Sequence, residues 1–399
     1  MLKEISGNII ARILNSFFAL IIAVIISQTL GSEGRGEQSI IMATISIIVI
    51  ITGIIGPSSI TYLLPRKPFN ELFIPSCLWI FIITSISVPF MSILKVININ
   101  YIYEVCLLIM LISFHNLLTS IFTARQNIKA INIIMILQIV ITFILITISF
   151  FVLKFKSLHS YFISSIVGYL IANVFGFLSI KNEFSNSFKF SFNINTLKSQ
   201  FLLGLYNQLA NLIQLLNFRY SYFVVDKFIG KGAVGILSNA FSIAESIWVI
   251  SRSTAIVFHS KIVNMKNIIS IRLLTKRIII NSFFILIALN LLLIILPDKI
   301  YQILFGSEFI NLKKYILPLI PGIIAFGLNI ILIYFYSGIG KHHINLISNL
   351  GGFLILILGL YLFIPINGIL RAILSTNMCY FTVFLINLIV FIVQTKKLK

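Results

Sequence analysis

Charged residues are scarce in this chain of 399 residues, where Asp, Glu, Lys and Arg together make up only 10%. A soluble domain usually carries about 25% charged residues, so this chain has too few to cover a water-exposed surface. Hydrophobic residues reach 59% and the mean hydropathy is +1.08. The composition excludes an ordinary soluble globular protein and predicts that lipid is the main solvent.

The residue clusters of most enzyme sites are also missing. The three cysteines, Cys77, Cys106 and Cys379, lie inside apolar runs and form neither a disulfide framework nor a metal-site spacing. We find no Gly-Lys-Ser/Thr phosphate loop, no His or acid cluster for a metal and no paired carboxylates. The glycine-rich stretch 31–37 joins two apolar runs, a context that does not suit a dinucleotide site. We therefore expect neither an enzyme nor a cofactor.

Acidic residues are rarer than basic ones, 10 against 30, which gives a net charge of +20. In a soluble protein this excess would suggest nucleic acid. In this chain the basic residues lie in short gaps between long apolar runs. We interpret them as topology signals and as contacts to anionic lipid, and we expect no nucleic acid as a partner.

Twelve apolar runs are long enough to cross a bilayer as helices, which needs about 20 residues each. Pro57, in the sequence Gly-Pro-Ser-Ser, predicts a kink in the second run, either as a hinge or as ordinary packing. The predicted spans are 9–30, 39–62, 72–94, 104–124, 131–152, 158–180, 200–224, 232–258, 276–297, 314–337, 344–364 and 369–393.

Lys and Arg are unevenly distributed between the two sets of connecting loops. The set that includes both chain ends holds nearly twice as many of them as the other set. Because cytoplasmic loops carry the excess of Lys and Arg, both termini are predicted to be cytoplasmic. All the loops are short, so we expect no catalytic domain outside the membrane.

The second half of the chain repeats features of the first half. At an offset of 199 residues (230 − 31), Gly31, Gly36 and Ser39 correspond to Gly230, Gly235 and Ser238. At an offset of 213 (329 − 116), Asn116 corresponds to Asn329. Six spans in each half would give parallel repeats, an arrangement that places a substrate site between the halves near the midplane. We predict one six-helix bundle in residues 1–190 and another in 191–399.

Two of the predicted spans carry similar stripes of polar residues. Asn8, Arg12 and Asn15 lie on one face of the first span, and Asn207, Asn211 and Gln214 lie on one face of the seventh. These six residues are candidates for a polar lumen that binds substrate. The alternatives are interhelical hydrogen bonds for the amides and a snorkelling side chain for Arg12.

A third set of polar residues follows one face of the eighth span. Glu245, Trp248, Arg252 and His259 are spaced by 3, 4 and 7 residues. Our preferred interpretation is that Glu245 and Arg252 face a hydrated cavity, and the alternative is that each pairs with a neighbouring helix. Arg219, in the seventh span, either snorkels or joins Arg12 and Arg252 in a basic interior that attracts anions. Glu245 is then the candidate site for coupling to H⁺ or Na⁺.

Four features resemble the O-antigen (Wzx-type) polysaccharide flippases of the multidrug/oligosaccharidyl-lipid/polysaccharide exporter superfamily. They are Lys3 followed by the polar first span, the turn Leu30-Gly-Ser-Glu-Gly-Arg-Gly-Glu37, Gly-Pro followed by Leu63-Leu-Pro-Arg66, and two bundles of six helices. The specific residues lie mostly in the first part of the chain, whereas the architecture covers all of it. The resemblance implies an all-α, MATE-like membrane fold.

The resemblance also implies a function. A flippase of this type moves an undecaprenyl-diphosphate-linked oligosaccharide from the cytoplasmic to the periplasmic leaflet of a bacterial inner membrane. Arg12, Arg219 and Arg252 would engage the diphosphate, and the halves would alternate in access. Implied partners are the lipid-linked oligosaccharide, the phospholipid bilayer, a coupling H⁺ or Na⁺, and the glycan polymerase machinery.

Three other functions compete with this one. A small-molecule exporter of the same fold would carry organic cations, and the excess of arginine in the spans disfavours it. A membrane polymerase or glycosyltransferase would need a long periplasmic loop, which the sequence lacks. A flippase for another lipid-linked glycan stays open, because nothing in the sequence reports sugar identity.

Overall fold

The computed structural model describes residues 2–93, 98–181, 193–263, 265 and 267–396. It describes the backbone alone for residues 2–6, 8, 263, 363–367 and 394–396. Within these ranges the chain forms helices and no strand. The α-helices are α1 (Leu2–Thr52), α2 (Pro57–Leu63), α3 (Phe69–Ile93), α4 (Ile102–Ala124), α5 (Ile128–Thr147), α6 (Leu158–Ser179), α8 (Ile194–Phe228), α9 (Lys231–Val263), α10 (Ile268–Ile295), α11 (Asp298–Phe305), α12 (Leu312–Gly338) and α13 (His342–Lys396).

The lengths of these helices match the predicted spans. Ten segments of the described chain are long and apolar enough to cross a membrane. The first, Ile9–Leu63, has 55 residues, about 82 Å at 1.5 Å per residue, and so covers two predicted spans. The span predicted at 200–224 lies in α8, which has 35 residues and is more polar. The protein is an all-α integral membrane protein, as the composition predicted.

Two local predictions differ from the structure. Residues 31–38 were expected to be a loop, but helix continues on both sides of a single break at Gly31, where φ is 69°. One glycine in the left-handed region is enough to interrupt the helix, so no further loop residues are needed. Pro57 does not kink a long helix. It starts the short helix α2 after a break at Gly56, a position where the missing N–H of proline costs nothing.

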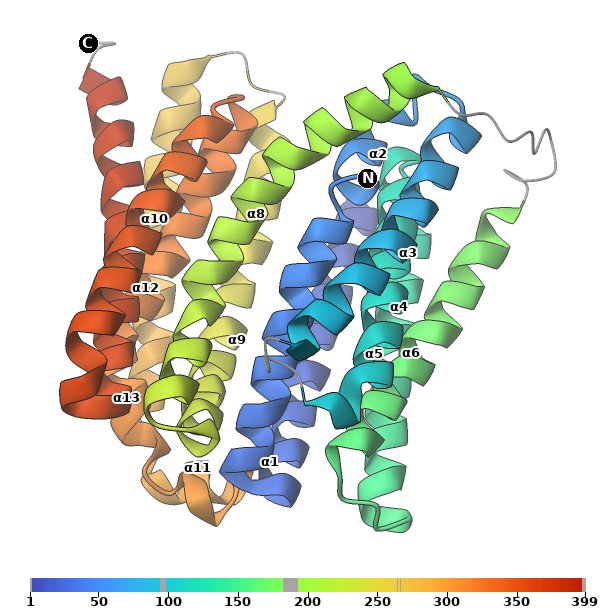
Figure 1. The fold of residues 1–399 in the computed structure, drawn as a ribbon. Helices are drawn as coiled ribbons and strands as arrows, with labels where there is room; N and C mark the ends of the chain where they lie inside the picture. The colour runs from blue at the N-terminus through green and yellow to red at the C-terminus, as the bar shows by residue number, and fades with distance from the viewer. Residues whose placement is uncertain (1, 94–97, 182–192, 264, 266, 397–399) are drawn as a thin grey trace. The chain divides into compact units, whose positions relative to one another are not determined.

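The chain folds into two compact units. One contains residues 1–22 and 40–212, and the other contains residues 23–39 and 213–399. In the first unit α6 packs against α4 and α5, and in the second α12 packs against α9, α10 and α13 (Figure 1). Part of α1 therefore belongs to the second unit, and the start of α8 belongs to the first. The division at residue 190 follows chain order and stays a prediction.

The paired glycines of the repeat form a close helix crossing in the second unit. A Cβ atom on Gly36 would lie 1.9 Å from the carbonyl oxygen of Lys231, and one on Gly235 would lie 1.9 Å from that of Ser32. The two contacts are equivalent under the repeat offset of 199 residues (230 − 31). Ser32 corresponds to Lys231, and Gly36 corresponds to Gly235. The two repeats thus meet through equivalent glycines. An ion pair between Lys231 and Glu37, 2.8 Å long, lies beside the crossing.

The segment between α10 and α12 was expected to be a loop, and it contains the amphipathic helix α11. The C-terminal end of α11 and the residues that follow it are hydrogen-bonded to α1. Gln28 donates hydrogen bonds to the carbonyl oxygens of Ile303 and Leu304 at 2.9 and 2.8 Å. The Glu308 carboxylate accepts a hydrogen bond of 2.7 Å from the backbone N–H of Ser32. Glu308 thereby caps the helix that restarts after Gly31, where a negative charge is favourable.

This cap should loosen in acid. Hydrogen bonds from the side chain and backbone of Ser32 lower the pKa of Glu308 below its ordinary 4.5. A carboxylate with a lowered pKa in the folded state contributes its stabilisation above the ordinary value and loses it as the pH falls through the folded value. We expect amide hydrogen exchange at Ser32 to be slow near neutral pH. Below about pH 4.5 it should approach the exchange measured at the same pH in Glu308→Ala. Equal Ser32 exchange in both proteins at neutral pH would rule out the cap.

The first half of α8 is held by the first unit through backbone and polar contacts. A Cβ atom on Gly204 would lie 1.7 Å from the carbonyl oxygen of Ile54, so α8 directly contacts the turn between α1 and α2. Thr196 donates a hydrogen bond of 2.7 Å to Glu71. Gln200 donates to the carbonyl oxygen of Leu72 at 3.2 Å. These contacts fix the stripe of polar residues that begins on α8 one turn later.

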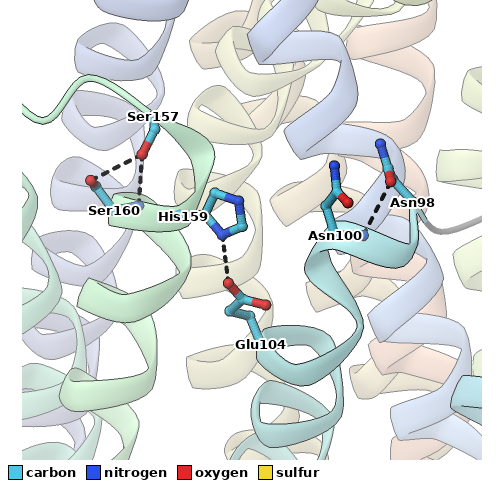
Figure 2. A network of polar contacts seen from close by, with 6 residues as sticks. All are labelled: Asn98, Asn100, Glu104, Ser157, His159 and Ser160. Carbon is cyan, nitrogen blue, oxygen red and sulfur yellow. Dashed lines mark hydrogen bonds and ion pairs between the residues drawn. The ribbon is translucent and has the colours of Figure 1, made fainter.

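A separate polar network links α4 and α6 in the first unit, at the end predicted to be periplasmic (Figure 2). The Nδ1 atom of His159 lies 2.6 Å from Oε1 of Glu104. Ser157 caps α6 by accepting a hydrogen bond from the backbone N–H of Ser160 at 3.3 Å. The His159 side chain is 46% exposed, so this contact lies at the surface of the protein. Glu104 therefore offers a matched control for the carboxylate described next.

Candidate functional site

An ion pair inside the membrane joins α8 to α9 in the second unit. A terminal nitrogen of Arg219 lies 2.7 Å from Oε1 of Glu245, and the two side chains are 25% and 32% exposed. Glu245 is about 21 Å along α9 from its start at Lys231, well within a hydrocarbon core about 30 Å thick. Arg219 also donates a hydrogen bond of 2.9 Å to the hydroxyl of Tyr222. Each charge is compensated by its partner, yet both remain accessible.

Four aromatic rings support this pair. They come from α8, α9, α12 and α13, and their centroids lie 4.8 to 6.0 Å apart: Phe218, Trp248, Phe326 and Tyr380. Trp248 donates a hydrogen bond of 2.8 Å to the carbonyl oxygen of Ile323. Arg219 directly follows Phe218, and Glu245 lies one helical turn before Trp248. The aromatic cluster therefore fixes the backbone positions of both charges.

A second arginine is buried near this pair. Arg35, on α1, is 7% exposed. Its Nε donates to Oδ1 of Asn239 and a terminal nitrogen donates to Oγ of Ser242, both at 2.9 Å, and it also bonds to Gln38. Asn239 in turn donates to Ser27 at 2.8 Å. These hydrogen bonds hold the guanidinium of Arg35 against the face of α9 that carries Asn239 and Ser242.

Tyr222 lies within electrostatic range of Arg35, Arg219 and Glu245. Its ring stacks on Phe241 at 5.8 Å. A cation that binds Glu245 would weaken the attraction between Glu245 and Arg219.

The other predicted site residues are spread over α1, α8 and α9. Arg12 is exposed and Asn15 half-buried on α1, Asn207 and Asn211 are exposed, and Gln214 is half-buried on α8. Asn211 donates a hydrogen bond of 2.9 Å to Gln208. The Asn8 side chain lies outside the described residues. The polar stripe of α8 is thus open to its surroundings, and the roles of these residues in binding stay predictions.

The predicted face of α9 divides into different environments. Trp248 is 1% exposed and belongs to the aromatic cluster, so it does not line a cavity. Glu245 pairs with the neighbouring helix α8, which was the alternative interpretation. Arg252 is exposed and His259 is half-buried. The structure brings Arg219 and Glu245 together and leaves Arg252 seven residues further along α9.

Sequence reasoning missed Arg35, because it assigned this residue to an outer loop. The signal was the equivalence of Gly36 and Gly235, which requires α1 and α9 to cross next to Arg35. A second missed feature is a set of buried amides: Asn387 donates to Asn329 at 2.7 Å, and Asn217 donates to Asn349 at 3.2 Å. These amides join helices of the second unit, a common role for amides in membranes.

Several solved structures have the same fold. An inward-facing multidrug resistance MATE transporter of the MOP superfamily matches with a TM-score of 0.77 and 14% identity, covering 96% of this chain and 95% of that chain. The lipid II flippase MurJ, in an inward closed conformation, matches with a TM-score of 0.79 and 17% identity, covering 98% and 87%. An outward-facing MATE transporter of the MOP superfamily gives 0.70 and 15%, covering 100% and 96%.

The chain has the fold of the MATE transporters and of MurJ. At these identities the likeness establishes the fold and nothing finer. No protein-family model and no curated protein sequence matches the chain.

Proposed function

We propose that this protein is a flippase of the MOP superfamily that moves an undecaprenyl-diphosphate-linked oligosaccharide, the O-antigen repeat unit, from the cytoplasmic to the periplasmic leaflet. Its place is the bacterial inner membrane, with both termini in the cytoplasm. The observation that carries the proposal is the accessible Arg219–Glu245 pair inside the membrane. An arginine at this depth suits a diphosphate that must cross the hydrocarbon core.

In the proposed mechanism Glu245 and the diphosphate compete for Arg219. While Glu245 is ionised, it occupies the guanidinium. When H⁺ or Na⁺ neutralises Glu245, the fork of Arg219 becomes free to form paired hydrogen bonds with phosphate oxygens. Release of the cation restores the ion pair and displaces the diphosphate. The exchange couples cation movement to substrate movement without a covalent step, so no cofactor is needed.

The remaining predicted residues complete the proposal. Arg12 and Arg252 contact the diphosphate at other stages of alternating access, and the amides Asn8, Asn15, Asn207, Asn211 and Gln214 hydrogen-bond to the glycan. A glycan polymerase would take the product in the periplasmic leaflet.

Complementation tests this function. A bacterium that lacks its own O-antigen flippase but makes the lipid-linked unit should regain the lipopolysaccharide ladder when it expresses this chain. A chain that inserts in the membrane and restores no ladder with a matched glycan would contradict the O-antigen proposal. It would favour a flippase for another lipid-linked glycan.

A second candidate is a small-molecule exporter, favoured by the similarity to MATE transporters. An exporter of organic cations would use Glu245 as its substrate site, with Arg219 as the displaced partner. Resistance of a drug-sensitive strain to cationic dyes, lost in Glu245→Gln, would support this candidate over the flippase.

Coupling through Glu245 makes a separate prediction. In proteoliposomes with an imposed H⁺ or Na⁺ gradient, Glu245→Gln should lose the gradient dependence of substrate movement. A coupled gradient that accelerates movement about tenfold corresponds to about 1.4 kcal/mol. Glu104→Gln removes a carboxylate from the exposed His159 pair and should retain full coupling. If both variants respond to the gradient like the wild type, the coupling role of Glu245 is wrong.

A further inference from the structure

An unused arginine lies buried near the start of α10. Arg272 is 8% exposed, and its Nε has no hydrogen-bond acceptor among the described residues. Arginine stays protonated in proteins, so this position holds a permanent charge. A charge this deeply buried is unfavourable unless an anion compensates it.

The sequence around this arginine offers no carboxylate. No Asp or Glu occurs between Glu245 and Asp298, or after Glu308. The group near Arg272 in electrostatic range is Tyr336, whose hydroxyl donates its hydrogen to the carbonyl oxygen of Asn387 at 2.6 Å. Tyr336 belongs to an apolar cluster with Ile271, Phe335 and Phe391. No carboxylate side chain of these stretches is thus available to compensate Arg272.

The depth of Arg272 indicates where that anion would lie. Residues 278–295, the rest of α10, carry no charge and span about 27 Å, close to the thickness of the hydrocarbon core. Arg272 precedes this run by about 9 Å, which places it in the headgroup layer at the end predicted to be cytoplasmic. Two exposed apolar side chains, Ile269 and Leu273, flank it on α10 and can contact acyl chains.

Basic residues surround this position. Lys276 lies one turn after Arg272 on the same face of α10. The half-buried Lys341 follows α12, and its backbone N–H bonds to the carbonyl oxygen of Tyr336. A phosphate group in the headgroup layer would thus meet a planar guanidinium with two flanking ammonium groups.

We propose that Arg272, with Lys276 and Lys341, forms a binding site for the phosphate of an anionic phospholipid headgroup. The lipid neutralises the buried guanidinium and stabilises the packing of α10 against α12. The site is separate from the Arg219–Glu245 pair and does not depend on the proposed transport function.

Thermal unfolding of the full chain in lipid nanodiscs tests the site. Phosphatidylglycerol added to phosphatidylcholine discs should raise the unfolding temperature of the wild type. Arg272→Gln removes the buried charge, so it should be at least as stable as the wild type in phosphatidylcholine alone. In discs with phosphatidylglycerol it should be less stable than the wild type. The order of the two proteins should therefore reverse between the lipids.

Three comparisons keep the test decisive. Arg277→Gln makes the same charge change at an exposed position and should keep the full response to phosphatidylglycerol. Inorganic phosphate in phosphatidylcholine discs should not reproduce the lipid effect, and an equal effect would identify a free-phosphate site and overturn the lipid site. A loss of stability in Arg272→Gln that is equal in both lipids would show a purely structural arginine and overturn the proposal.

Discussion

Replacing Arg219 by alanine is expected to abolish export of the glycan while the protein still inserts in the membrane. Hydrogen bonds to charged groups contribute about 1.5–3 kcal/mol each, so losing a bidentate contact to the diphosphate should slow transport at least about a hundredfold. Stability should change less, because Glu245 is 32% exposed and can be hydrated once its partner is lost. The lipopolysaccharide ladder, measured at matched protein levels, reports the effect.

Two further variants separate charge from geometry at this position. Arg219→Lys keeps the positive charge and the ion pair but lacks the planar fork, so it should restore only part of the export. Arg277→Ala removes an exposed arginine at the predicted cytoplasmic end of the ninth span and should leave the ladder unchanged. Full export by Arg219→Ala would remove Arg219 from the mechanism and, with it, the competition between Glu245 and substrate.

Adding one methyl group at Gly36 or Gly235 should destabilise the protein strongly. Each new Cβ would lie 1.9 Å from a carbonyl oxygen of the facing helix, so α1 and α9 would have to separate. Overpacking of this kind costs about 1–3 kcal/mol, which should appear as a lower unfolding temperature in detergent for Gly36→Ala and Gly235→Ala. The unfolding temperature of the double variant should fall by less than the sum of the two single decreases. The first methyl group already separates the two helices, so the second methyl group adds little further strain.

Gly7 provides the matched control. It lies within α1, and among the described residues a Cβ atom there would meet the side-chain amide of Asn132 at an ordinary 3.6 Å. Alanine is the better helix former, so Gly7→Ala should be neutral or stabilising. If Gly36→Ala unfolds at the same temperature as Gly7→Ala, the close crossing is wrong.

Much of the architecture was predictable because the membrane constrains the chain. Each apolar run must become a helix to satisfy its backbone, so the twelve runs predicted the helices well. Helix ends were harder to predict. The stretch 31–38 was expected to be a loop because glycine-rich segments usually are, whereas only Gly31 breaks the helix. The helix α11 was missed because it is too short to show a span signal.

The site was predicted less well, and the reason is physical. A sequence shows which residues share a face of one helix, but it does not show which helix covers that face. Glu245 and Arg219 were both singled out, yet their pairing depends on the packing of α8 against α9. Trp248 shares the periodicity of Glu245 and Arg252, but the rings of Phe326 and Tyr380 bury it. The role of Arg35 was missed for the same reason, because it depends on the packing of α1 against α9.

The interleaving of the two compact units has a consequence for synthesis. Residues 23–39 leave the ribosome early, but the surface that receives Gly36 is supplied by Lys231 and Gly235, which follow about two hundred residues later. The backbone surface around Gly36 therefore lacks its contact partner until α9 has been synthesised and inserted. The first unit is likewise incomplete until Leu212 has been added. A chain truncated after α6 would contain neither unit completely. We therefore expect the native fold to form only after the whole chain has been synthesised.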